Sequence, residues 1–349
     1  MKEVIRKMNS NKKSGLTRTP GIFHLKDLKP RSNKNRTCSL YVEFDQDFKE
    51  RLFKDLLAIA KSVRNLSKET GISFSQLWDQ LTRVPFSVNN IKKISQFLVK
   101  KEFQKYSLDN LEKEIFYIKS GGGNSEILYY PNFPIDLATK SGMRLISHIY
   151  HDGSIGKNNK QPNYRNLSKE MCIQFLDDAN IVFGKINRTT KWNKDKTYSV
   201  HLPTVIGEIL ISIGYCSGNK TKNNPPTFSF LDQINDEECI SEFLAMAFND
   251  DGCVGRRSVM IQQSSLIMKD EKKPSNVLML DKRFLEKLGI KVNGPNLDKI
   301  YPNRYGKCTK YSIYVYSKKE LRKFNEKIIL IDYKKRKLEN YLNNGYLKK

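Results

Sequence analysis

Two short stretches of this sequence end in an aspartate that is followed at once by a glycine. RLISHIYHDGSIG begins at Arg144, and FLAMAFNDDGCVG begins at Phe243; in each, apolar residues at helical spacing lead to the acid, Asp152 or Asp251. A carboxylate at the C-terminal end of a helix lies in an already negative field, and two that meet there repel each other unless a cation joins them. The pair therefore predicts a site for Mg²⁺ or Mn²⁺, which take hard oxygen ligands and the oxygens of phosphates.

The glycine after each acid extends this interpretation. Gly153 and Gly252 permit a tight turn out of the helix and a close approach of the backbone to a ligand, so we place both beside the metal. For one Asp-Gly pair alone, a helix that simply ends in a turn is the better explanation. The metal site is favoured because the pattern occurs twice, in register with a longer repeat.

From residue 134 onward, the chain contains two copies of one pattern. Each copy opens with an apolar helix ending in Asp-Gly, continues with strand-like segments, an amphipathic helix and a second strand pair, and closes with a helix and a basic segment. We therefore predict an α+β fold with two pseudo-symmetric αββαββα repeats over residues 134–231 and 232–349. Such a pair suits a DNA duplex, whose backbone has its own local two-fold axis.

Three further segments precede the repeats. Residues 1–36 are rich in Lys and Arg and lack periodicity, which predicts a flexible basic arm. Residues 37–120 contain helical and strand-like patterns and are expected to form a mainly helical domain. Residues 121–133, which open on a glycine-rich stretch, are predicted to be a linker.

The stretch SVRNLSKETGISFSQLWDQLTR has the layout of a helix-turn-helix. A first helix leads to Gly71 at the turn, and Ser73 is the expected N-cap of the second helix. On that second helix, Gln76, Gln80 and Arg83 would face a DNA major groove. The alternative is an ordinary helical packing unit that contacts no partner.

Composition points to a polyanionic partner. The 349 residues include 62 Lys and Arg against 37 Asp and Glu, a net charge of +25, and nucleic acid is the commonest partner for such an excess. A hydrophobic share of 38% is enough for packed cores, and no apolar run approaches the ~20 residues that a membrane span needs. The six cysteines are scattered without zinc-ligand spacing. We expect a cytoplasmic protein, associated with the nucleoid in a prokaryote or placed in an organelle.

Two rows of polar side chains are candidates for reading DNA. Val259 and Ile261 share one face of a predicted strand, and Arg and Gln on the opposite face can bond guanine and adenine edges. The row in the second copy is Arg256, Ser258, Gln262 and Ser264. The row in the first copy is Lys185, Asn187, Thr189 and Lys191. Polar strands of this kind can also be merely solvent-exposed.

The two acid stretches resemble the LAGLIDADG motif of homing endonucleases, in register over residues 145–153 and 244–252. The resemblance covers the chain from about residue 134 to its end. It implies a single-chain, site-specific endonuclease that acts as a monomer on double-stranded DNA. It further implies that the motif helices form the interface between halves, that strands lie along the major groove, and that Asp152 and Asp251 are catalytic and bind the metal.

The same resemblance assigns a basic residue of each half to the neighbourhood of the scissile phosphate. Lys220 fits this place in the first half, and Lys334 or Lys335 fits it in the second. A solvated basic patch that contacts phosphates passively is the alternative for these lysines. One departure from the family pattern is His148, which occupies the motif position held by Ala247 in the other copy; the interface must then accommodate a polar ring, and we expect it to form a hydrogen bond.

Two other functions stay open at this point. Some bacterial transcription regulators couple a degenerate LAGLIDADG domain to a helix-turn-helix and bind DNA without cutting it. An intron maturase would use the basic surface on RNA. We favour the endonuclease because a protein that only binds has no need of two opposed acids.

Overall fold

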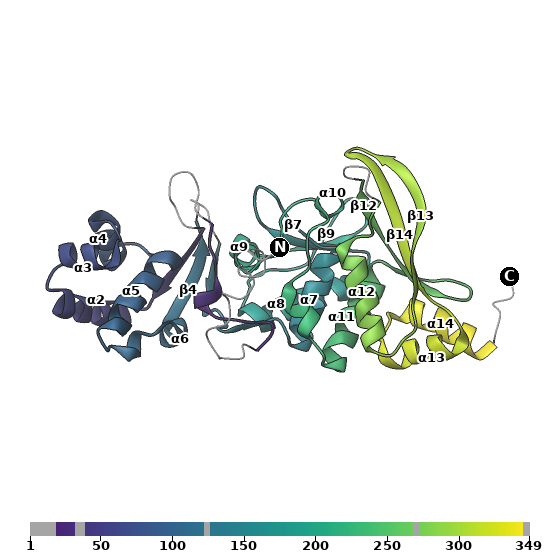
Figure 1. The fold of residues 1–349 in the computed structure, drawn as a ribbon, viewed down its shortest axis with the longest axis horizontal. Helices are drawn as coiled ribbons and strands as arrows, with labels where there is room; N and C mark the ends of the chain where they lie inside the picture. Colours follow the sequence, from purple (N-terminus) through teal and green to yellow (C-terminus); the bar gives the residue numbers. More distant parts are fainter. Residues whose placement is uncertain (1–18, 32–38, 122–125, 268–271, 345–349) are drawn as a thin grey trace, which may run out of the picture.

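The computed structural model describes residues 19–31, 39–121, 126–267 and 272–344. The chain is mixed α/β, and its strands form several small antiparallel sheets. In Figure 1, an N-terminal unit with most of its helices at one end of an elongated molecule is followed by the two repeats. No helix within the described ranges is both long and apolar enough to cross a membrane.

The N-terminal unit is built on a four-stranded sheet in the order β3-β2-β4-β5. Its strands are β2 (Leu40–Phe44), β3 (Phe86–Ser87), β4 (Ile115–Ser120) and β5 (Ile127–Tyr129). Its helices are α2 (Gln46–Ala60), α3 (Val63–Thr70), α4 (Phe74–Thr82), α5 (Val88–Lys100) and α6 (Leu108–Leu111). Strand β5 falls in the predicted linker but pairs with β4, so these residues belong to the sheet.

The two helices and the capping residues on which the helix-turn-helix prediction depends are present. Helix α3 ends at Gly71, which adopts a φ of 63° that suits glycine, and the side chain of Ser73 accepts a hydrogen bond from the backbone of Gln76 at the start of α4. Leu77 and Leu81 of α4 are buried, at 0% and 4% exposure. The apolar spacing therefore fixes which side of α4 faces the core.

Residues 19–31, which we call the N-terminal strap, correct the prediction of a flexible arm. Strand β1 (Ile22–Phe23) pairs with β6 (Ile135–Asp136), and the 3₁₀ turn η1 (Leu25–Asp27) follows it. Leu25 and Leu28 are fully buried, so the strap has apolar anchors that charge counting overlooks. The rest of the predicted arm, residues 1–18 and 32–36, lies outside the described residues.

The first repeat contains its elements in the predicted order. They are α7 (Lys140–Tyr150), β7 (Ser154–Ile155), β8 (Pro162–Asn166), α8 (Lys169–Phe183), β9 (Lys191–Trp192), β10 (Tyr198–His201) and α9 (Thr204–Ser212). The strands form a sheet in the order β7-β8-β10-β9. A short helix, α10 (Lys220–Asn223), follows.

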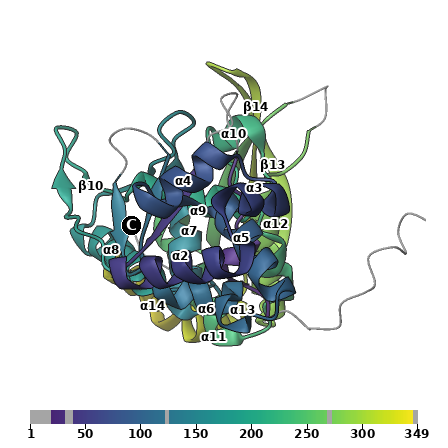
Figure 2. The same cartoon turned by 90° about the vertical axis from the view of Figure 1, so that its left-hand side faces the viewer.

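The second repeat has the same order of elements. They are α11 (Glu237–Asp250), β11 (Gly252–Val254), β12 (Val259–Leu266), α12 (Asn276–Lys287), β13 (Asn293–Asn303), β14 (Gly306–Val315) and α13 (Lys318–Lys327). Its sheet runs β11-β12-β14-β13, and α14 (Asp332–Asn344) follows. The β13–β14 hairpin rises above the body in both views (Figures 1 and 2).

Helices α7 and α11 pack side by side at the centre of the two repeats (Figure 1). Ser147 of α7 donates a hydrogen bond to the carbonyl oxygen of Phe243 in α11, at 2.7 Å. Arg144 links α7 to Glu242 of α11 at 3.1 Å and to Asp178 of α8 at 2.6 Å. A small residue and a charged clamp thus hold the two helices together along their length.

Candidate functional site

The C-terminal ends of α7 and α11 bring Asp152 and Asp251 into one neighbourhood. Asp152 lies just beyond α7 and is exposed, whereas Asp251 caps α11 and is half-buried. Although part of the residue reaches solvent, surrounding protein atoms shield the carboxyl of Asp152, and this burial, together with the charges of Asp250 and Asp251, raises its pKa to about 7. Burial also raises the pKa of Asp251, although His151 and Lys220 oppose that shift. The two acids occupy the like-charge setting that the sequence predicts.

Asp250 is a third acid at this point, to which we assigned no role from the sequence. Its buried carboxylate accepts from the Tyr164 hydroxyl at 2.6 Å and pairs with Nδ1 of His148 at 2.9 Å. The hydrogen bond expected for His148 is therefore present. The amide nitrogen of Asn166 lies 3.4 Å from Asp250 and 3.3 Å from Asp152, so one amide joins the acids of the two helices.

A lysine caps the end of each motif helix. Lys334 donates to the carbonyl oxygens of Phe248, Asn249 and Gly252 at 2.7 to 2.8 Å. Lys220 donates to the carbonyls of Ile149, Tyr150 and His151, at 3.2 and 2.8 Å for the first two. These are carbonyls that a helix leaves unpaired, and a cation there also suits the helix dipole.

The charge state of these lysines reflects their surroundings. Burial lowers the pKa of Lys220 to about 8, and the nearby acids limit that fall. Burial likewise lowers the pKa of Lys334, which is only 6% exposed. Lys335 is exposed, so of the two second-half candidates Lys334 is the one that reaches the helix end.

His151 and Asp281 form a buried pair between α7 and α12. Nδ1 of His151 lies 2.7 Å from the carbonyl of Ser147, and Nε2 lies 3.3 Å from Asp281. A carbonyl can only accept, so Nδ1 carries a hydrogen, and a hydrogen on Nε2 then makes the ring a cation. Burial lowers the pKa of His151, but Asp281 and Asp251 outweigh it and raise the value to about 9. This cation and the two lysines offset part of the negative charge of the acids.

An amide side chain from a neighbouring strand holds each of the two motif acids. Asn166 of β8 contacts Asp152, and Gln263 of β12 donates to Oδ2 of Asp251. The signal for Gln263 was its position, because it shares a strand face with the buried Ile261 and so points toward the helices. The sequence prediction concerned the outward row of that strand and therefore missed this residue.

The two glycines are required by close packing. A Cβ on Gly153 would lie 2.8 Å from the carbonyl oxygen of His148, and one on Gly252 would lie 2.5 Å from that of Phe248. Either contact would clash, so only glycine fits at these two positions, where the backbone turns away from the helix. The Gly252 carbonyl already accepts from Lys334.

Carboxylate oxygens such as those at this centre are the ligand type that ions like Mg²⁺ take. Burial, followed by the charges of Asp250 and Asp251, raises the pKa of Asp152, and a cation beside it would favour its charged form; Asp152 and Asp251 are the residues that would hold such a cation. Asp250 is already engaged by Tyr164 and His148. Because Mg²⁺ keeps several waters and takes phosphate oxygens, it does not need a closed cage of protein ligands.

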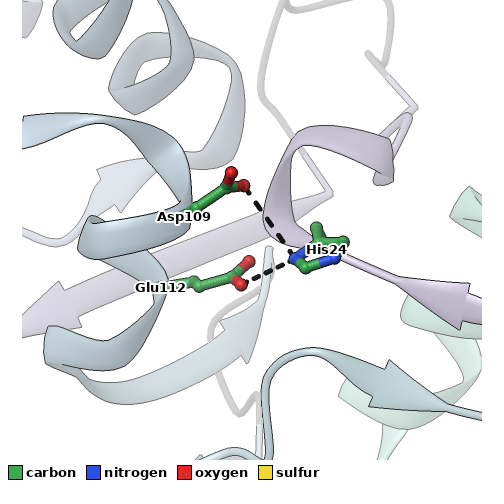
Figure 3. Close-up of side chains that lie close together, drawn as sticks. All are labelled: His24, Asp109 and Glu112. Carbon is green, nitrogen blue, oxygen red and sulfur yellow. Dashed lines mark hydrogen bonds and ion pairs between the residues drawn. The ribbon is translucent and has the colours of Figure 1, made fainter. Parts of the chain in front are cut away.

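Within the described ranges, ligand atoms of three acids or histidines come within 4.8 Å of one another at His24, Asp109 and Glu112. Figure 3 shows the His24 ring directed at both carboxylates, with Nδ1 at 2.7 Å from Glu112 and 3.9 Å from Asp109. Groups of this type could hold a metal ion. Here Lys26 also pairs with Asp109 and the Leu25 amide donates to Glu112, so the protein's own donors satisfy both acids. We interpret the cluster as the clasp that fastens the N-terminal strap to α6.

The candidate DNA-contact row of the first repeat is exposed but irregular. Only Lys191 lies in a strand, at the edge of the sheet, and the side chains of all four residues reach solvent. The row is Lys185, Asn187, Thr189 and Lys191. A hollow of about 860 Å³ on the outer sheet face takes in most of this row together with Arg188, Ser199 and His201.

In the second repeat, Val259 and Ile261 are buried as expected, at 1% and 0% exposure. Gln262 and Ser264 of β12 lie on the opposite face, where Ser264 accepts from the hydroxyl of Tyr301. Arg256 and Ser258 precede the strand, because β12 begins at Val259. They are exposed and half-buried, respectively, so the predicted row has two strand members and two turn members.

On α4, the structure separates the three residues that we expected to face DNA. Gln76 and Arg83 are exposed. Gln80 is 6% exposed and its side-chain oxygen accepts from the amide of Asn90 at 3.0 Å, so its assignment to DNA contact is wrong. Gln80 lies one helical turn after Leu77, beside the buried stripe of Leu77 and Leu81, and Asn90 of α5 is its polar partner there.

Comparison with protein families and with curated proteins yields no match. Among solved structures, the chain is similar to the homing endonuclease I-DmoI in complex with DNA and Ca, with 14% identity and a TM-score of 0.34 over 55% of this chain and 90% of that one. It is similar to the N-terminal LAGLIDADG domain of DUF199/WhiA, with 14% identity and a TM-score of 0.32 over 58% and 89%. Full-length DUF199/WhiA from Thermatoga maritima gives 13% identity and a TM-score of 0.33 over 61% and 65%. Values this low do not establish family membership.

Proposed function

We propose that this chain is a site-specific double-strand DNA endonuclease of the LAGLIDADG type, built from two pseudo-symmetric repeats and dependent on Mg²⁺ or Mn²⁺. The observation that carries the proposal is the meeting of two acids from two packed helices, Asp152 and Asp251, whose helix ends are each capped by a lysine. Like charges brought together at helix ends are a costly arrangement that a divalent cation would relieve.

In this proposal each residue has a defined task. Asp152 and Asp251 hold the metal, which supplies charge stabilisation for the attacking and leaving oxygens of a phosphodiester. Asn166 and Gln263 fix the rotamers of the two carboxylates. Lys220 and Lys334 keep the helix ends, and therefore the acids, in place.

Binding is assigned to the outer faces of the two sheets and to α4. The net charge of +25 supplies phosphate affinity that falls as salt rises, while exposed polar side chains read bases. Gln76 and Arg83 on α4 add contacts outside the repeats. The working unit in this proposal is a monomer on duplex DNA.

The test uses full-length protein and sheared genomic DNA of a host that lacks the gene, with capture and sequencing of new ends. We expect ends at one long sequence in Mg²⁺ and none in EDTA. Asp152→Asn and Asp251→Asn should bind that sequence without cutting it. Undiminished cleavage by both variants would reject the metal assignment.

A DNA-binding regulator without cleavage is the second candidate, and one observation favours it. Lys220, Lys334 and the His151 cation already offset part of the acid charge, so the acids are tolerable without a metal. Sequence-specific binding in the same assay, with no metal-dependent ends at any bound sequence, would support this function over the nuclease.

A further inference from the structure

A hollow of about 620 Å³, which we call the tyrosine hollow, lies where the N-terminal unit meets the first repeat. Its lining includes Tyr129, at the end of β5, and Tyr130 on one side, and Ile181 of α8 on the other. All three side chains are exposed, and Tyr130 is the most exposed of them at 70%. Large apolar and aromatic side chains gathered in solvent around a hollow are typical of a surface that binds a partner.

The backbone around Tyr130 holds this residue in an unusual conformation. Its φ of 47° lies in the left-handed region that bulky residues rarely adopt. Its amide donates to the carbonyl of Phe116 at 2.8 Å, and the amide of Asn132 donates to the carbonyl of Phe183 at 3.1 Å. At the end of α8, a Cβ on Gly184 would lie 2.8 Å from the Tyr130 carbonyl oxygen. Such a conformation costs about 1–3 kcal/mol, persists only where the surroundings enforce it, and is commonest at functional sites.

The ring of Tyr130 has a face open to a ligand. Its centroid lies 5.2 Å from that of Phe116, and the two rings meet at an angle of 76°. In a perpendicular pair the edge of one ring meets the face of the other, so Phe116 covers at most one face of Tyr130. The other face remains in solvent, where a flat ring could stack on it.

Two polar side chains in the tyrosine hollow are available to a ligand. Lys185 and Asn187 line it and are exposed, and within the described part of the chain no hydrogen bond or ion pair holds either side chain. The amides of Asn132 and Asn180, by contrast, are bonded to the backbone of α8 and of the residues after it. An ammonium group suits a phosphate, and an unengaged amide can bond the edge of a base.

A more basic hollow adjoins the tyrosine hollow. Asn187 also lines the hollow of about 860 Å³ on the outer sheet face. There, shielding by protein atoms, followed by the charges of three nearby cations, lowers the pKa of the His201 ring. Arg188 is paired with Glu126, whereas Lys191 extends into solvent. A nucleic-acid backbone bound across this positive hollow would carry a base to the aromatic one.

We propose that the tyrosine hollow binds an unpaired nucleotide of a single-stranded nucleic acid. One base stacks on the open face of Tyr130, Asn187 bonds the edge of that base, and Lys185 contacts a phosphate. A base inside a duplex is already stacked between its neighbours, so only an unpaired one can take this place. The inference assigns Lys185 and Asn187 to an unpaired strand instead of a duplex groove. It goes beyond the proposed function, because it needs neither a metal nor cutting.

The test separates the contribution of bases from that of phosphates. Full-length protein in EDTA and about 0.3 M salt, which weakens phosphate contacts, is titrated with a labelled strand of about 12 nucleotides and with an abasic strand of equal length. Both strands are prepared as DNA and as RNA. We expect the strand with bases to bind at least about fivefold more tightly, the lower end of what stacking one base contributes. The sugar that shows this difference identifies the kind of strand that the site takes.

Three variants and a control assign the effect to the tyrosine hollow. Tyr130→Ala should abolish the difference between the two strands, and Tyr130→Phe should retain it, because the ring and not the hydroxyl stacks. Lys185→Gln should weaken binding of both strands alike, since it removes a phosphate contact. Tyr316→Ala, which removes an exposed tyrosine of the second repeat, should keep the wild-type difference.

The outcomes separate this inference from the proposed function. Equal affinity of the wild type for strands with and without bases, in DNA and RNA alike, would overturn the inference and leave the proposed action on duplex DNA standing. The wild-type difference retained in Tyr130→Ala would also overturn it, because the bases would then stack elsewhere. A clear difference that Tyr130→Ala abolishes, in a protein that cuts no genomic DNA, would support the inference while the proposed function fails.

Discussion

One lysine at the end of each motif helix explains how three acids can lie together at the ends of two packed helices. Asp152, Asp250 and Asp251 lie where both helix dipoles are negative, and repulsion alone would separate the helix ends. Lys220 and Lys334 donate to the terminal carbonyls and place positive charge beside the acids. Because the two lysines bond backbone carbonyls and not the acids themselves, they supply positive charge without occupying the carboxylate oxygens of Asp152 and Asp251.

Lys334→Met should destabilise the protein. The substitution removes the lysine donor from the carbonyls of Phe248 and Asn249 in α11 and of Gly252 just after it, which we expect to lower the free energy of unfolding by about 2 kcal/mol. Lys335→Met is the matched control, because that side chain is exposed, and it should change stability by less than about 0.5 kcal/mol. Urea unfolding of the two variants measures both values. Equal effects would contradict the capping role.

Asp152 should make stability depend on pH. Its folded-state pKa of about 7 lies above the ordinary 3.8, so the unfolded chain ionises first as pH rises. Stability is therefore lost between about pH 4 and pH 7. In EDTA at pH 8, Asp152→Asn should be more stable than wild type by roughly 1 kcal/mol, a value discounted for solvent screening of an exposed carboxyl. The difference should shrink at pH 4.5; an equal difference at both pH values would show that the carboxyl does not titrate in this way.

The residues of the site were only partly foreseeable. Asp152 and Asp251 could be singled out because the repeat makes them stand out in the sequence, whereas Lys220 was assigned only through the family resemblance. Asp250 could not be given a role, since its partners Tyr164 and His148 come from elements whose pairing the sequence does not specify. The contact of Gln263 with Asp251 depends on strand register, because a shift of one residue would turn this side chain to the other face of the sheet.

At the scale of elements, apolar spacing was the reliable guide and polar residues were not. The stripe of Leu77 and Leu81 correctly placed α4 against the core. Gln80 lies next to that stripe, and only the amide of Asn90 on α5 decides that it points inward. The hydrophobic periodicity of one helix does not show which polar residue of a neighbouring helix will contact it.

Gln80→Ala and Gln76→Ala should therefore behave in opposite ways. Gln80→Ala leaves the Asn90 amide unpaired inside the unit and should cost about 1–2 kcal/mol of stability. Gln76→Ala should leave stability unchanged and weaken DNA binding, because its side chain is exposed on α4. Thermal unfolding and fluorescence anisotropy with duplex DNA distinguish the two effects. Reduced DNA binding by a fully stable Gln80→Ala variant would restore the original assignment.

At the scale of the whole molecule, the N-terminal strap connects the N-terminal unit to the first repeat, although its composition predicted a flexible arm. Leu25 and Leu28 are buried, and the backbone amide of Lys29 donates to Ser212 at the end of α9 in the first repeat. Arg31 adds an ion pair to Glu208 of the same helix at 2.8 Å. A truncation meant to isolate the repeats must therefore keep residues 19–31.

Leu28→Ala should destabilise the full-length protein by about 3 kcal/mol, the usual result of emptying a fully buried leucine site. Lys29→Ala is the neighbouring control, since its side chain is exposed and its backbone contact to Ser212 is retained. Calorimetric unfolding of both variants gives the comparison. A strap that contributes nothing would show the same transition temperature in both.

Binding of Mn²⁺ by the full-length protein, followed by electron paramagnetic resonance without DNA, tests the shared acid centre most directly. Asp152→Asn and Asp251→Asn should each weaken binding by about tenfold or more, since each removes a charged ligand. His24→Asn, in the clasp of Figure 3, should leave it unchanged. Wild-type affinity in both aspartate variants, with binding lost in His24→Asn, would place the metal at the clasp and contradict the account.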